Sequence, residues 1–124
     1  MAPELKKALA ASAESLVAAL AGDAAKAELV AQMMKALGNS TRVRIVAYLC
    51  GDGERTVSEI SEALGLTQAI TSQQLAALRL NGAVRARREA GYRHYSLAIP
   101  ELKDLMCCVA GCCQAAHGRG GAAA

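Results

Sequence analysis

The chain has 124 residues, enough for one domain with a sizeable core and too few for two domains of ordinary size. It contains no Phe or Trp and only three Tyr, so its core must come mainly from Ala, Leu, Val, Ile and Met, most of which favour helices. No run of about 18 uncharged apolar residues is present, and the start lacks a basic segment before an apolar one, so we expect no membrane span or secretory leader and a cytoplasmic location.

Positive charge is concentrated in one part of the sequence. The net charge is +3, but residues 68–95 hold five arginines and one glutamate, a net charge of +4, which leaves −1 for the rest. A local basic patch of this kind suits phosphate contact, although a solvated charged surface has the same composition.

Two amphipathic helices are predicted before residue 38. Pro3 can occupy the first turn of a helix in which leucines recur at helical spacing as far as Leu20. Asp23 can cap a second helix, which Gly38 ends. Long alanine-rich helices gain stability by packing on a partner, so the pattern favours a dimer.

Three shorter helices are predicted between residues 39 and 82. Asn39 and its neighbours can cap a helix that runs to Cys50. Thr56-Val-Ser-Glu59 matches a capping box and begins a helix that ends at Gly65. The last helix, Thr67–Gly82, follows after a short turn, and two helices joined so tightly form a helix-turn-helix.

The helix over residues 67–82 has an apolar and a polar side. The side chains expected in the core are Ile70, Leu75, Leu78 and Leu80. The polar side chains expected to point outward near its start are Gln68, Thr71, Ser72 and Gln73. Uncharged donors and acceptors of this kind can read base edges in a DNA groove.

The pattern changes after residue 82. Alternation of small or apolar residues with arginines over residues 83–97 predicts a β-hairpin that turns across 89–91 and has arginines near its tip. Pro100 can open a last helix. Residues 118–124 have no pattern to bury, so we expect a disordered tail after a single DNA-binding and dimerisation domain over 1–117.

Four runs of the sequence, taken together, match a known family. They are Lys35–Ile45, Ser58–Leu66, Gln73–Arg79 and Asn81–Leu97. Over residues 33–97 the chain resembles the ArsR/SmtB transcriptional repressors. The resemblance implies a mainly α fold with a small β-hairpin wing, a winged helix-turn-helix, in a homodimer whose N- and C-terminal helices form the interface.

The resemblance also implies double-stranded operator DNA as the partner. We expect no enzymatic activity, because His117 lies in the tail and no second acid or base group accompanies the cysteines. The candidate base contacts are Gln68, Thr71, Ser72 and Gln73. The candidate phosphate or minor-groove contacts are Arg87, Arg88 and Arg93. A member typically represses its own operon and releases DNA when an inducer binds.

Four of the five cysteines stand within seven residues near the C-terminus. The Cys-Val-Cys site of many metal-sensing members is absent, because this chain has Thr56-Val-Ser58 there. At 100° per residue, Cys107, Cys108 and Cys112 would share one side of a helix, with Cys113 further round. Three thiolates suit As(III) or Sb(III), and another soft metal ion would accept a similar set, so the first hypothesis is a repressor released by such an inducer, with no permanently bound cofactor.

Other functions remain open at this point. An oxidant or polysulfide could link Cys50 to Cys112 or Cys113, as in some persulfide-responsive members, and would make the protein a redox sensor. An iron–sulfur cluster is a third use of the cysteines. A constitutive architectural DNA binder would show no release at all.

Overall fold

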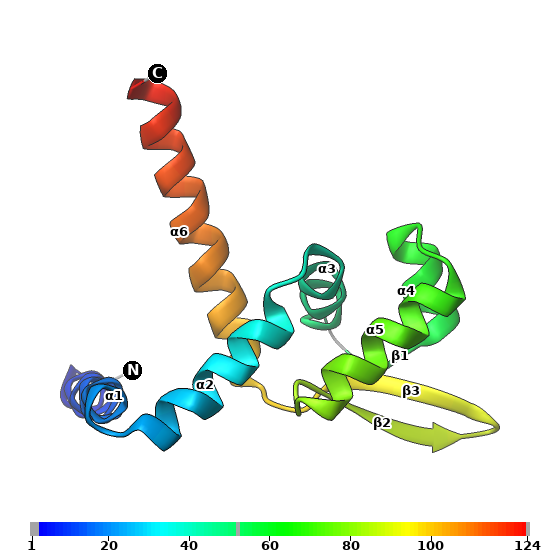
Figure 1. Cartoon of the computed structure of the whole chain (residues 1–124), viewed down its shortest axis with the longest axis horizontal. Coiled ribbons are helices and arrows are strands. Elements are labelled where there is room, and N and C mark those ends of the chain that lie inside the picture. Colours follow the sequence, from blue (N-terminus) through cyan, green and yellow to red (C-terminus); the bar gives the residue numbers. More distant parts are fainter. Residues whose placement is uncertain (1–2, 52, 124) are drawn as a thin grey trace. The chain divides into compact units, whose positions relative to one another are not determined.

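The computed structural model describes the backbone of residues 3–51 and 53–123 and the side chains of residues 13–51 and 53–118. The chain divides into two compact units, one ending at Lys35 and one beginning at Ala36, and each is described by itself. Figure 1 shows the elements in chain order.

The first unit contains α1 (Pro3–Gly22) and most of α2 (Ala24–Leu37). The predicted cap is confirmed, because the Asp23 carboxylate accepts the amide hydrogens of Ala25 and Lys26 at 3.0 and 3.2 Å. The two helices leave large apolar side chains exposed to solvent. Examples are Leu16, Val17 and Leu29, each about two-thirds exposed.

Three helices build the core of the second unit: α3 (Ser40–Leu49), α4 (Val57–Leu64) and α5 (Gln68–Leu80). Each begins at a residue whose side chain accepts a backbone amide hydrogen of the first turn, namely Asn39, Thr56 and Thr67. Gly65 ends α4 in the left-handed conformation, so that α5 follows after a short turn. The fully buried side chains that join the three helices are Ile45, Val46, Ile60, Leu75 and Leu78.

The apolar side of α5 is narrower than its sequence pattern indicates. Leu75 and Leu78 are buried as predicted, but Ile70 is 43% and Leu80 88% exposed, so the prediction of a core position for these two residues is wrong. The buried arc is completed instead by Thr71, which is fully buried. Spacing alone does not say which arc of a helix its neighbours cover.

The predicted hairpin is confirmed as β2 (Val84–Glu89) and β3 (Tyr92–Leu97), and a third strand joins it. This strand, β1 (Arg55–Thr56), pairs antiparallel with β3, so that the strand order is β1-β3-β2. The β2–β3 ribbon, which we call the wing, contacts α5 through β2 (Figure 1). The sequence pattern does not predict β1, because two residues are too few to show alternation.

Ala90 and Gly91 form the turn of the wing, and both have positive φ, at 53° and 80°. The left-handed region is unfavourable for alanine, whereas Asn-Gly is the preferred pair in such two-residue turns. We expect Ala90→Asn to raise the free energy of unfolding by about 0.5–1 kcal/mol in chemical denaturation. Ala76→Asn, the same change inside α5, should lower it, and a loss of stability in both variants would contradict the observed turn.

The last helix, α6 (Glu101–Ala123), is longer than predicted. Residues 118–123 continue the helix where the sequence analysis expects a disordered tail, and residue 124 lies outside the described residues. Helical hydrogen bonds are local, so a helix can continue without a side to bury. Among the described residues, no helix combines the length and apolar character needed to cross a membrane. A single domain over residues 1–117 stays a prediction.

Candidate nucleic-acid interface

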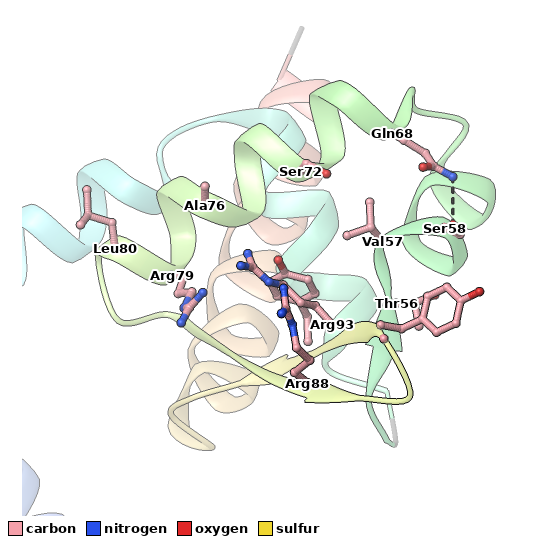
Figure 2. A pocket seen from close by; sticks show the side chains of 13 residues that line it. Thr56, Val57, Ser58, Gln68, Ser72, Ala76, Arg79, Leu80, Arg88 and Arg93 are labelled. Atoms are coloured by element: carbon pink, nitrogen blue, oxygen red, sulfur yellow. Dashed lines mark hydrogen bonds between the residues drawn. The ribbon is translucent and has the colours of Figure 1, made fainter.

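A groove opens between α5, the first turn of α4 and the wing, and Figure 2 shows its lining. We call it the reading groove. The polar side chains that line it include Ser58, Gln68, Ser72, Arg79, Arg88 and Arg93. Hydrogen-bonding groups from two helices and cations from the wing therefore face one space, as recognition of a nucleic acid requires.

Gln68 and Ser72, two of the predicted base contacts, line the reading groove from the first turns of α5. The helix begins at Gln68 because the Thr67 hydroxyl accepts the amide hydrogen of Ile70 at 3.1 Å. The carboxamide of Gln68 donates a hydrogen bond to the Ser58 hydroxyl of α4 at 2.9 Å (Figure 2). Ser58 also lines the groove, although its place in the sequence does not predict contact with DNA.

Thr71, another predicted base contact, is buried and does not face the groove. Its hydroxyl donates to the carbonyl oxygen of Thr67 at 2.8 Å and lies 3.0 Å from the hydroxyl of Ser61, to which it is hydrogen-bonded. Because Ser61 is also buried, this contact fixes α4 against α5 inside the core. The prediction for Thr71 is therefore wrong: its role is to hold the two helices together.

Gln73, the fourth predicted base contact, is exposed on α5 but does not line the reading groove. At 100° per residue it lies well round the helix from Gln68 and Ser72. By the same reckoning Arg79 lies within about 20° of Gln68. Arg79 lines the groove and is missing from the predicted set, although this spacing would have found it.

Arg88 and Arg93 face each other across the wing, as paired residues of β2 and β3, and both line the groove. Together with Arg79 of α5 they bring three guanidinium groups to the groove (Figure 2). None of the three forms a salt bridge within the described part of the chain. These positive charges are therefore available to an anionic ligand such as a phosphate backbone.

Arg87 occupies the other face of the wing, contrary to its grouping with Arg88 and Arg93. Its guanidinium donates to Glu54 at 2.7 Å and to Glu89 at 2.7 Å. The hydrogen bonds from Arg87 hold the pKa of the Glu54 carboxyl below its usual range. Successive residues of a strand point to opposite faces, so Arg87 and Arg88 cannot share a groove.

The cysteines lie apart from the reading groove. Cys107, Cys108, Cys112 and Cys113 are all exposed on α6. Among the described side chains, no three metal-ligating groups converge on one point. The helix thus displays the thiols together without forming a closed site.

Cys50 is half-buried at the end of α3, where it lines a cavity together with Lys103 of α6. Burial raises the pKa of its thiol, and the positive charge of Lys103 opposes this shift. Lys103 and Cys112 are nine residues apart on α6, about 13 Å along the helix axis. A disulfide needs Cα atoms within about 7 Å, so a bond from Cys50 to Cys112 or Cys113 in one chain requires α6 to bend or unwind.

The sequence and structure of the chain are similar to those of known DNA-binding regulators, in agreement with the geometry of the groove. Residues 39–86 match the family model described as bacterial regulatory protein, arsR family. The transcriptional activator HlyU of Vibrio cholerae is 39% identical over 74 residues, which cover 60% of this chain and 68% of HlyU. A probable mercury resistance operon repressor of Streptomyces lividans is 35% identical over 95 residues, covering 71% of this chain and 75% of the repressor.

A solved structure supports the fold. The homodimeric winged helix-turn-helix DNA-binding domain of a possible ArsR-family regulator from Mycobacterium bovis superposes with a TM-score of 0.67 at 35% identity, over 73% of this chain and 83% of that domain. The relatives of this chain named above are regulators of transcription, and none of them is an enzyme. The chain therefore belongs to the ArsR family of bacterial regulatory proteins, as a winged helix-turn-helix transcriptional regulator.

Proposed function

We propose that the chain is a homodimeric repressor that binds operator DNA through the reading groove and releases it when a soft, thiophilic ion such as As(III) or Sb(III) binds the cysteines of α6. The observation that carries the DNA-binding part is the convergence of Gln68 and Ser72 with Arg88 and Arg93 on one groove. Amides and hydroxyls supply base contacts, and the guanidinium groups supply phosphate or minor-groove contacts. Gln73, which is exposed on α5 outside the groove, is kept as a further proposed base contact.

A second copy of the chain is the partner that the exposed apolar surfaces favour. In the first unit, an apolar groove lies between α1 and α2. The exposed side chains of Leu16, Val17 and Leu29 line it. In the second unit, Leu105 and Val109 of α6 are partly exposed as well. Apolar surfaces of this kind are usually covered by a partner, and the related domain from Mycobacterium bovis is a homodimer.

The proposed inducer site uses the four exposed thiols of α6. A trivalent ion needs three thiolates on one side of it, and a regular helix keeps Cys107, Cys108 and Cys112 spread over about 140°. Binding would therefore draw the thiols together by unwinding α6 near Gly111, or would take a thiolate from the second copy. Either change alters α6, which is an interface helix in the proposed dimer. The distance between the α5 helices of the two copies then changes as well. The mercury resistance repressor of Streptomyces lividans makes a soft ion a reasonable class of ligand.

The alternative is a redox or persulfide switch that joins Cys50 to Cys112 or Cys113. Its support is the half-buried thiol of Cys50 beside Lys103, which can attract an anionic polysulfide. The distance along α6 weighs against a link within one chain. A disulfide or polysulfide link between two copies of the chain is compatible with this alternative.

The thiol proposal predicts a clear response of the reduced protein. Micromolar arsenite should release the wild-type dimer from its operator, and Cys107→Ser/Cys108→Ser should raise the concentration needed by at least about tenfold, because two of the thiolate ligands are lost. Fluorescence anisotropy of labelled operator DNA measures the release. Without arsenite, the affinity of the double variant for operator DNA should differ from that of the wild type by less than about threefold.

Cys50→Ser is the matched control for this experiment. It should respond to arsenite like the wild type, because its thiol lines a cavity that contains none of the α6 cysteines. If arsenite, antimonite and cadmium all leave the fully reduced wild type bound, the thiophilic-ion proposal is wrong. If polysulfide releases the wild type and Cys50→Ser abolishes that response, the redox alternative is correct.

A further inference from the structure

Ser58 and Gln68 form the one contact in the reading groove that joins a proposed base-reading side chain to the neighbouring helix within the described residues. The Gln68 Nε2 atom donates to Ser58 Oγ at 2.9 Å, and both side chains are exposed to the groove (Figure 2). Free glutamine side chains on a helix surface sample several rotamers, and binding must then select one of them. The hydrogen bond selects one before DNA arrives.

The backbone around both residues is held firmly. Ser58 lies in the first turn of α4, where Thr56 and Glu59 form a reciprocal capping box with distances of 3.0 and 3.2 Å. Thr56 also pairs with β3 of the wing. The buried contact between Ser61 and Thr71 fixes α4 against α5 one turn further along. The Ser58 hydroxyl therefore stands at a set position relative to the start of α5.

The chemistry of the carboxamide leaves Gln68 free to read a base while it is held. The Nε2 group has two hydrogens, and Ser58 takes one of them. The second N–H and the Oε1 atom remain, and these are the donor and acceptor that match N7 and N6 of adenine in the major groove. A reversed amide would turn Oε1 toward Ser58 and would exchange the positions of the donor and the acceptor that face the base.

We infer that Ser58 is a positioning residue that holds the Gln68 carboxamide in the orientation that reads adenine. The inference rests on the proposed function, because it assumes that the reading groove binds DNA. Ser58 sets the preference for one base pair in each half-site, whereas the arginines of the groove set affinity for DNA in general.

The test uses the full-length dimer and a library of duplex DNA with randomised sequence. Selection with the wild type should give a half-site containing an A·T pair that Gln68→Ala no longer prefers. Ser58→Ala should lose the same preference, with about 3- to 10-fold weaker binding to the selected sequence, and Ser58→Thr, which keeps the hydroxyl, should restore it. Ser96→Ala, which removes a hydroxyl that accepts a hydrogen bond from Arg85 outside the groove, should change neither.

The outcomes separate the inference from the proposed function. If Gln68→Ala changes the base preference and Ser58→Ala does not, the positioning role is wrong and the groove still reads DNA. A loss that is uniform across all sequences in Ser58→Ala also overturns the inference, since it would mark a phosphate contact. If Gln68→Ala, Ser72→Ala and the arginine variants all leave selection unchanged, the reading groove itself is misassigned.

Discussion

Replacing both Arg88 and Arg93 by alanine is expected to weaken operator binding by at least about a hundredfold near physiological salt. The two guanidinium groups face the reading groove from paired positions of the wing, and neither forms a salt bridge among the described residues. The proposed dimer would lose four contacts of this kind. If all four are to phosphates, the slope of log affinity against log salt concentration should fall by about four, which titrations at several salt concentrations measure.

Arg87→Ala is the control, because it removes an arginine from the same strand and the opposite face. The charge of Arg87 is already balanced by Glu54 and Glu89, so its loss should leave the salt slope nearly unchanged. Equal losses of affinity and slope in the two experiments would show that both faces of the wing contact DNA. The separation of Arg87 from Arg88 and Arg93 would then not describe the bound state.

Leu78→Ala is expected to lower the free energy of unfolding by about 2–5 kcal/mol, whereas Leu80→Ala should change it by less than about 0.5 kcal/mol. The two leucines are two residues apart on α5, but Leu78 is fully buried and Leu80 is 88% exposed. Only the first substitution leaves a cavity among packed side chains. Chemical denaturation at one fixed protein concentration measures both, because unfolding of a dimer depends on concentration.

The comparison of these variants also tests the orientation of α5. A cost of several kcal/mol for Leu80→Ala would mean that this side chain is covered in solution, and the reading groove would then lack one of its lining residues. A small cost for Leu78→Ala would contradict the observed core. Either result would require α5 to be turned relative to α3 and α4.

Features that depend on local interactions could be predicted from the sequence. The starts of α2, α3, α4 and α5 each depend on a side chain that bonds a backbone amide two or three residues away. The hairpin depends on alternation and on a turn between adjacent strands. Gln68, Ser72, Arg88 and Arg93 line one groove because they lie on elements of this local kind, and their contact with DNA stays a prediction.

Features that depend on distant partners could not be predicted. The burial of Thr71 follows from Ser61, which belongs to another helix. Arg87 is held by Glu54, which is 33 residues away in the sequence. The strand β1 exists only through its pairing with β3. In each case the two contacting residues belong to different elements of the chain. The periodicity of apolar residues within one element therefore does not predict the contact.

Thr56 is both the last residue of β1 and the N-cap of α4, so one residue belongs to the wing sheet and to the helix-turn-helix. Because the buried contact between Ser61 and Thr71 also fixes α4 against α5, a tilt of the wing relative to α5 would have to break the β1–β3 pairing or one of these helix contacts. Duplexes present their grooves at an angle and a depth that depend on the local twist. Under the proposed function, this connection through Thr56 should make binding depend on helical pitch as well as on sequence, so overwound or underwound operators of identical sequence should bind less tightly.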